Sequence, residues 1–190
     1  SRFPTGTGTE ARRKMKKITV LVSSVRKVRA ADNILSFVKK NLETYDDVEF
    51  KVVDLKDLEL PFFDSSKLPT DETFKIPYDN VRVWSDAVES ADGVIMLTPE
   101  YNHSLSAAQK NAIDWLYSQW QDKPVAIVSY SWGATYAIDH LASVLAQVNA
   151  LKVEPVARLA FKKDIEIDGS AIDQKAVDDK ISATISALLA

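Results

Sequence analysis

Two short segments of the chain bring aromatic rings together with amide, imidazole and hydroxyl groups. Residues 98–104 read Thr-Pro-Glu-Tyr-Asn-His-Ser, and residues 129–133 read Ser-Tyr-Ser-Trp-Gly. Each segment follows an apolar run, at the point where a buried strand is expected to end. Aromatic walls with a few polar groups suit a planar heteroaromatic ligand. The structural alternative is that Tyr101, Tyr130 and Trp132 are packing residues and that Ser104 only caps a helix.

A third segment, residues 23–29, reads Ser-Ser-Val-Arg-Lys-Val-Arg and could bind an anion. We expect it between the first strand and the first helix, where free backbone N–H groups and the helix dipole favour negative charge. Ser24 can donate a hydroxyl hydrogen bond, and Arg26 or Arg29 can hold a phosphate through two hydrogen bonds. A solvated basic turn is the alternative. The segment has neither G-x-G-x-x-G nor G-x-x-x-x-G-K-S/T, which disfavours a dinucleotide lying against glycines and an NTPase.

The elements that must position these segments alternate between strands and helices. Apolar, β-branched runs predict five strands, over residues 18–23, 48–55, 93–98, 124–129 and 153–159. Helical spacing predicts five helices, over residues 30–42, 79–88, 104–120, 134–148 and 173–189. Three prolines predict a long irregular loop over residues 58–78. The alternation indicates an α/β fold with a parallel sheet, whose ligands sit beyond the carboxyl ends of the strands.

The composition excludes several kinds of site. The 190 residues carry a formal net charge of −3 and contain no cysteine, which excludes disulfides, thiolate metal sites, iron–sulfur clusters and cysteine catalysis. His103 and His140 form no His-x-x-His or Glu-x-x-His pair, so a metal enzyme is not expected. Lys and Arg are scattered, so we expect no nucleic acid partner. Without a secretory signal or an apolar run near the ~20 residues that span a bilayer, we expect a cytoplasmic protein with no membrane contact.

We expect one domain over residues 15–190 and an extension before it. Residues 1–14 contain two of the five glycines, three threonines and the basic run 12–14, but no hydrophobic period. We therefore interpret them as a disordered extension or tag. Without their four cationic and one acidic residues, the net charge of the remaining body changes from −3 to −6.

On these residues the chain resembles the family of NAD(P)H-dependent FMN reductases and quinone reductases. The most specific match joins residues 98–104 to Lys-Asn-Ala-Ile-Asp-Trp at 110–115, similar to the family's T-P-E-Y-N-x-S and K-N-A-I-D-W. Residues 123–130 resemble its fourth strand, and Ser-Val-Arg at 24–26 resembles its S-x-R phosphate loop. The resemblance implies a flavodoxin-like three-layer sandwich with a five-stranded parallel sheet in the order 2-1-3-4-5.

The resemblance also implies an FMN site at the three segments. Ser24 and Arg26 would bind the FMN phosphate, with Arg29 assisting. The residues along the isoalloxazine ring, much of the contact being through backbone groups, would be Pro99, Glu100, Tyr101, Asn102 and His103. Those closing its other edge would be Tyr130, Ser131, Trp132 and Gly133.

The implied chemistry belongs to the flavin, and no side chain need act as an acid or a base. NAD(P)H would be the hydride donor, and small-molecule electron acceptors would be the partners: quinones, flavins, azo dyes or chromate, in a ping-pong cycle. We also expect a homodimer, or a tetramer of two dimers, because Trp115, Tyr117, Trp120 and residues 61–63 offer candidate apolar interface.

The chain departs from the family's pattern where glycine is usual. Ser23 replaces the glycine before the loop serine, Val28 a small residue, and Ser106-Ala107 a Pro-Gly pair, while Gly133 is alone in its loop. Glycine allows positive φ and close backbone approach, so the main alternative is a flavodoxin-like binding or regulatory protein with weakened or lost FMN binding. Trp132 would either cover a bound flavin and narrow the range of acceptors, or fill the empty slot of a protein that no longer binds flavin. A flavodoxin that passes single electrons is a third hypothesis, for which a charge of −6 is only moderately acidic.

Overall fold

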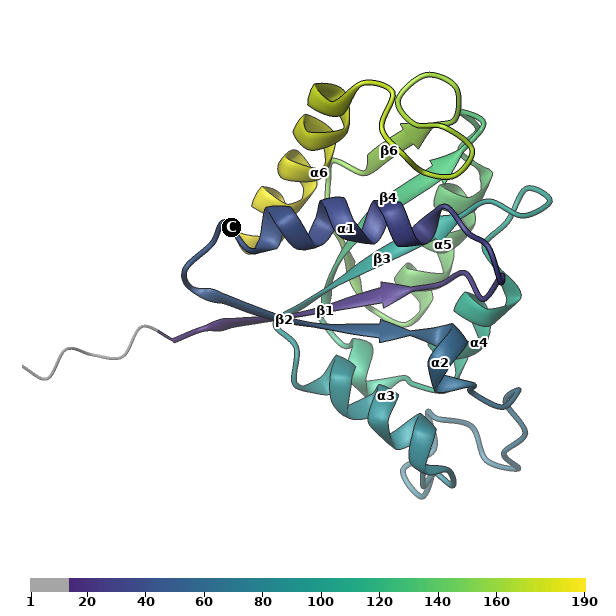
Figure 1. Cartoon of the computed structure of the whole chain (residues 1–190). Coiled ribbons are helices and arrows are strands. Elements are labelled where there is room, and N and C mark those ends of the chain that lie inside the picture. Colours follow the sequence, from purple (N-terminus) through teal and green to yellow (C-terminus); the bar gives the residue numbers. More distant parts are fainter. Residues whose placement is uncertain (1–13) are drawn as a thin grey trace, which may run out of the picture.

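A parallel sheet forms the centre of the molecule, seen in a computed structural model that describes residues 14–190 (Figure 1). Its strands are β1 (Lys16–Val22), β2 (Val48–Asp54), β3 (Gly93–Pro99), β4 (Pro124–Ser131), β5 (Leu151–Lys152) and β6 (Ala157–Ala160). The order is β2-β1-β3-β4, and β5 and β6 both pair with β4 at the outer position. This is the flavodoxin-like order, and it confirms the predicted topology. The expected extension over residues 1–14 lies almost wholly outside the described residues.

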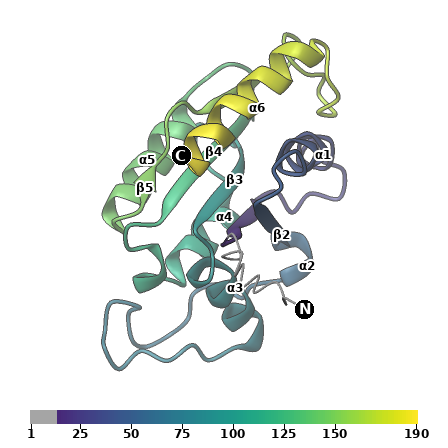
Figure 2. The same cartoon turned by 90° about the vertical axis from the view of Figure 1, so that its left-hand side faces the viewer.

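Helices cover both faces of the sheet, which is why its central strands are apolar on both sides. α1 (Ala31–Leu42) and α6 (Gln174–Leu189) pack on one face, and α3 (Asp79–Glu89), α4 (Ala107–Asp114) and α5 (Tyr136–Gln147) pack on the other (Figure 2). Alternate residues of each strand point to opposite layers, so Ile95 and Leu97 face α1 and α6 while Val94 and Met96 face the other helices. None of the described helices is long and apolar enough to cross a membrane.

The helix predicted over residues 104–120 is wrong in extent. The helix α4 begins after Ser106, whose hydroxyl accepts from the Gln109 N–H at 3.0 Å, and it ends at Asp114. A 3-10 turn, Ser118–Trp120, follows it. The break lets both Trp115 and Trp120 enter the core, where each is fully buried. These two tryptophans are therefore core residues and not the interface surface that the sequence suggested.

The fifth strand is also different from its prediction over residues 153–159. The chain forms the short strand β5, leaves the sheet at residues 153–156, and returns as β6. Pro155 lies in this gap, and proline has no N–H with which to continue a ladder. The outer strand is consequently interrupted beside the middle of β4, whose amino end pairs with β5 and whose carboxyl end pairs with β6.

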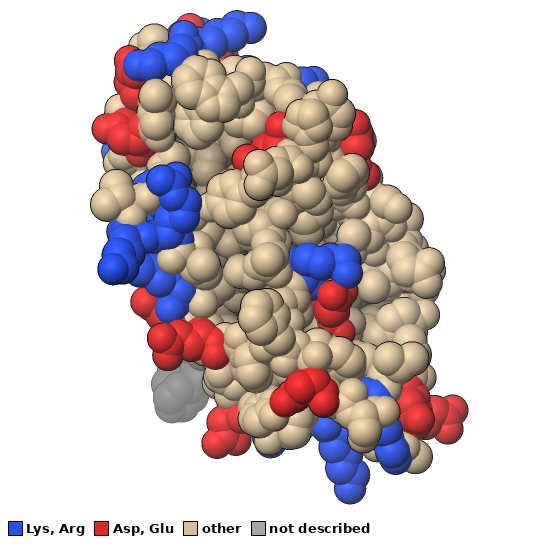
Figure 3. Space-filling view, turned by 90° about the vertical axis from the view of Figure 1, so that its right-hand side faces the viewer, with Lys and Arg blue, Asp and Glu red and all other residues tan. Residues whose placement is uncertain are grey.

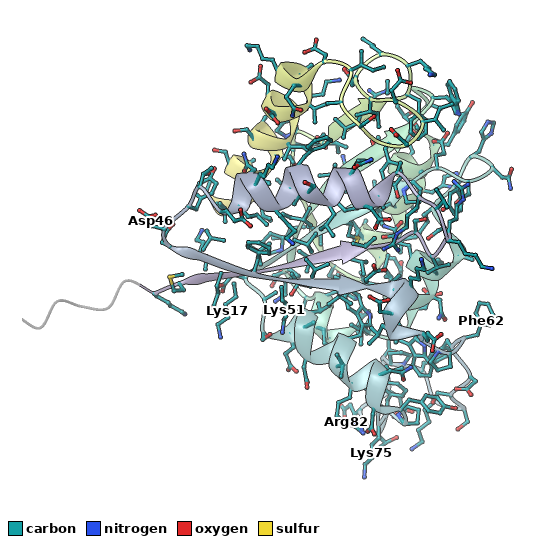
Figure 4. The ribbon with its side chains drawn as sticks, viewed as in Figure 1. Lys17, Asp46, Lys51, Phe62, Lys75 and Arg82 are labelled. Carbon is teal, nitrogen blue, oxygen red and sulfur yellow. The ribbon has the colours of Figure 1, made fainter. Side chains whose placement is uncertain are left out.

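The predicted loop over residues 58–78 is confirmed apart from one short helix, α2 (Leu55–Leu58), at its start. The side chains of Asn111 and Trp115 both donate to the Pro61 carbonyl, at 2.9 and 2.8 Å, and so hold the loop against α4. Phe62 projects outward from the same loop and is 78% exposed (Figure 4).

Residues 161–172 connect β6 to α6 and pack against the start of α1. The Asn33 side chain donates to the Asp168 carbonyl at 2.8 Å. Gly169 has a φ of +85°, and a Cβ added there would lie 2.4 Å from the Ala30 carbonyl oxygen. Glycine is required here both by its φ and by the close approach of the two backbones.

We predict that Gly169→Ala lowers the free energy of unfolding by about 2–4 kcal/mol, because positive φ and overpacking add. Gly133→Ala is the matched control, since Gly133 also has a positive φ (+98°) but nothing within 4 Å of an added Cβ. Urea unfolding of both variants measures the difference. Equal losses in the two variants would contradict the contact between residue 169 and α1.

Candidate active site

The three predicted segments meet beyond the carboxyl ends of β1, β3 and β4, which are neighbours in the sheet. The Ser24 hydroxyl lies 2.9 Å from the Tyr101 hydroxyl, and the Ser106 hydroxyl donates to the Ser23 carbonyl at 2.8 Å. Figure 3 looks onto this end of the molecule, where much of the surface is uncharged and most Lys and Arg atoms lie toward the edges, with one group right of centre beside acidic atoms. The segment after β1 and the segment after β3 therefore form one continuous site.

Tyr130 contributes a buried hydroxyl to this site. Its residue is 4% exposed, and the hydroxyl has no hydrogen-bond partner among the described residues. Burial raises the pKa of Tyr130 and Tyr101 adds to the rise, while Arg29 and Arg26 oppose it. The phenol is thus neutral, and its ring packs edge-on to Phe161 in the core that faces α1 and α6. Buried polar groups rarely lack a partner, so this one is a candidate ligand contact.

Residues 101–104 form a tight two-residue turn. The N–H of Tyr101 donates to the Ser104 carbonyl at 2.8 Å, and the Ser104 N–H donates back to the Tyr101 carbonyl at 3.0 Å. Asn102 and His103 at the tip have φ values of +50° and +65°. Asparagine tolerates this region better than most residues, so the turn reaches positive φ without glycine.

The side chains around this turn are held by α5. A Glu100 carboxylate oxygen accepts from the Ala137 N–H at 3.0 Å, which caps a helix whose own N-cap residue makes no side-chain cap. The His103 ring stacks on Tyr136 with 3.8 Å between centroids, and His140 Nδ1 lies 3.0 Å from the Ser104 hydroxyl. The contacts made by Glu100 and His103 therefore fix the turn, and its backbone and Tyr101 remain to face a ligand.

Arg29 is enclosed by its own chain, whereas Arg26 is free. The Arg29 side chain is 6% exposed; it pairs with both carboxylate oxygens of Asp54, donates to Asp32 at 3.1 Å and donates to the Ser24 carbonyl. Its hydrogen bond to Asp54 raises the pKa of Arg29. Burial raises the pKa of Asp54, but Arg29 and the Lys56 N–H outweigh it and lower that pKa. Arg26 is exposed and makes no hydrogen bond or ion pair with the other described residues.

The segment after β4 lies at the other side of the site. Ser131 is buried, and its hydroxyl donates to the Ala134 carbonyl and accepts from the Gly133 N–H, both at 3.2 Å. Trp132 is 69% exposed and meets Phe161 edge to face. Phe161 was not among the residues predicted for the site, because the sequence predicted no helix or strand over residues 160–172. No group of three acidic or histidine side chains within residues 14–190 could hold a metal ion.

Comparison with known proteins places this chain in a family. The family model of NADPH-dependent FMN reductases matches residues 16–163. An NAD(P)H-dependent FMN reductase of Saccharomyces cerevisiae is 33% identical over 156 residues, which cover 77% of this chain and 80% of that one. A quinone reductase of Escherichia coli is 35% identical over 109 residues, 52% of this chain and 57% of that one.

A solved structure agrees with these relatives. A flavoenzyme NAD(P)H:(acceptor) oxidoreductase of Paracoccus denitrificans superposes with a TM-score of 0.70 at 26% identity, covering 92% of this chain and 98% of that one. The family, the oxidoreductase class and the two cofactors expected from the sequence are thereby confirmed. The chain belongs to the NADPH-dependent FMN reductase family, and it is a flavodoxin-like oxidoreductase that uses FMN and NAD(P)H.

Proposed function

We propose that the protein reduces small acceptors, quinones above all and also flavins, azo compounds or chromate, with electrons from NAD(P)H in a ping-pong cycle. The observation that carries the proposal is a hydroxyl cluster near the exposed side chain of Arg26. The Ser24 and Tyr101 hydroxyls are in contact at 2.9 Å, and the unpartnered Tyr130 hydroxyl belongs to the neighbouring strand β4. The names of the yeast and Escherichia coli relatives support this acceptor class. The cytoplasmic location and the homodimer stay predictions.

The residues present fit FMN. A phosphate would meet the Ser24 hydroxyl and Arg26 near the start of α1, where the N-cap residue Ala30 offers no side-chain acceptor to the helix N–H groups. The unpartnered Tyr130 hydroxyl is a further donor on the same side. When bound, FMN supplies the chemistry of the reaction, accepting a hydride from NAD(P)H and passing it to the acceptor.

The chain's own contribution is to bind and to orient. The turn at residues 101–104 would place its backbone along the ring, and its attachment to α5 through Glu100 and His103 limits its movement. Residues 131–133 would form the opposite edge. A neutral Tyr130 donates a hydrogen bond without carrying charge, so it suits a donor and not a base at neutral pH.

The first test is whether the purified protein retains FMN after gel filtration, and whether Arg26 holds the phosphate. We expect Arg26→Ala to weaken FMN binding about 10- to 100-fold, because a charged hydrogen bond contributes about 1.5–3 kcal/mol. Lys27→Ala is the matched control, since it removes the same charge from the next exposed position of the loop. Fluorescence titration gives both dissociation constants. Equal weakening would contradict a specific role of Arg26, and no retained flavin would favour the binding-protein alternative.

Tyr130→Phe is expected to act in opposite directions on stability and on binding. Removing a buried hydroxyl that lacks a partner should raise the free energy of unfolding of the FMN-free protein by about 1 kcal/mol. Loss of the same donor should weaken FMN by about 3- to 10-fold. Tyr101→Phe is the contrast, because the Tyr101 hydroxyl has Ser24 as a partner and its removal should cost stability. A stability loss in Tyr130→Phe would show that the hydroxyl is already satisfied.

Arg29 is expected to act on FMN only through its partners. Asp54→Asn should weaken FMN binding, and Arg29→Ala should weaken it at least as much because it also loses the contacts with Asp32 and the Ser24 carbonyl. The double variant should be no weaker than Arg29→Ala, because the pair between the two residues is already broken in that variant. Riboflavin lacks the phosphate, so its affinity should fall less than that of FMN in each variant. General destabilisation would lower the two affinities by the same factor and leave their ratio unchanged. If Arg29 bound the phosphate directly, Asp54→Asn would free its guanidinium and leave FMN binding intact or tighter.

A further inference from the structure

A hollow whose lining includes residues 131–134 lies apart from the hydroxyl cluster. It has a volume of about 580 Å³ and is bounded by the end of β4, by β6 and by the loop that follows β6. Ser24, Arg26, Tyr101 and Tyr130 are not among its lining residues.

Two aromatic rings form one wall of this hollow. Trp132 is 69% exposed, and its ring centroid lies 5.5 Å from that of Phe161 at an interplanar angle of 62°. Phe161 is fixed in turn, because its N–H donates to the Ser131 carbonyl at 2.8 Å and its ring packs edge-on to Tyr130. The exposed indole is thus held in place, which suits it to pack against a flat ligand.

The charged side chains that line the hollow leave an excess of positive charge. Asp164 is buried and already satisfied, because it pairs with Lys180 at 2.8 Å and accepts from the Ala160 N–H at 2.9 Å. Arg158 reaches only the Gly133 carbonyl, at 3.4 Å, and the Lys163 ammonium has no hydrogen-bond or ion-pair partner in the described part of the chain. Two uncompensated cations therefore stand beside the two rings.

We propose that this hollow binds a flat aromatic group that carries negative charge. The rings of Trp132 and Phe161 would contact its apolar face, and Arg158 and Lys163 would pair with its anionic substituent. Two sources have this chemistry: an aromatic acceptor with a sulfonate or carboxylate, and the adenosine phosphate end of NADPH. The proposal does not require FMN to be bound, because the hollow is separate from the hydroxyl cluster.

Intrinsic fluorescence of the FMN-free protein tests this site, since Trp84, Trp115 and Trp120 are fully buried and only Trp132 is exposed. The two probes are naphthalene-2-sulfonate and adenosine 2′,5′-bisphosphate, with neutral naphthalene-2-sulfonamide as the charge control. We expect saturable quenching that Trp132→Phe abolishes. Calorimetry should show about 2- to 5-fold weaker binding for Arg158→Gln and for Lys163→Gln, the range of exposed charge pairs. Lys51→Gln, on β2 far from the hollow (Figure 4), should bind normally.

Each outcome decides the proposal. Binding of the sulfonate alone identifies an aromatic acceptor, and binding of the bisphosphate alone identifies the NADPH end; either supports the site. Absence of saturable binding by both probes overturns it, as does equal binding of the neutral sulfonamide. Displacement of a bound probe by FMN would also overturn it, by showing that the hollow belongs to the cofactor site. A failure of FMN to bind leaves these measurements unaffected, so the two proposals fail separately.

Discussion

Arg29 ties three parts of the chain together at the edge of the sheet: the carbonyl of Ser24, Asp54 at the end of β2, and Asp32 in the first turn of α1. Breaking such an enclosed pair by removing one partner is far more costly than losing a surface ion pair. The segment after β1 is therefore held in one conformation before any ligand arrives. The Ser24 hydroxyl is then in position to contact the Tyr101 hydroxyl. This contact links the segment after β1 to the turn after β3.

The site that results relies on neutral donors more than on charge. Ser24, Tyr101 and Tyr130 supply hydroxyls, and Arg26 is the one cation of segment 23–29 that is free and lies close to Tyr130. A site of this kind can orient a cofactor and stabilise charge that develops on it, but it holds no evident acid or base. That is consistent with a family in which the flavin carries out the reaction and the protein positions it.

The hydrophobic pattern predicted the alternation of strands and helices, and the family resemblance implied the strand order that the structure confirms. Prediction from the sequence failed where tertiary contacts decide. The helix expected over residues 104–120 breaks so that Trp115 and Trp120 can be buried, and Pro155 interrupts the last strand. Arg29 was expected to assist in binding the phosphate. Its ion pair with Asp54 could not be predicted, because the two residues are 25 positions apart in the chain. The attachment of Glu100 and His103 to α5 was invisible for the same reason.

The backbone angles of the structure show which positions of the ligand segments adopt the positive φ that glycine would favour. Asn102 and His103 adopt positive φ where the turn needs it, and in the segment after β4 the one residue with positive φ is Gly133 itself. The exposure of the Trp132 side chain bears on the two roles that the sequence suggested for it, which were to cover a bound flavin or to fill an empty flavin slot. A side chain that had filled an abandoned flavin slot would be buried, yet Trp132 is 69% exposed and leans against Phe161 on the β6 side. Its indole therefore contributes, together with Phe161, to the lining of the cationic hollow beside β6.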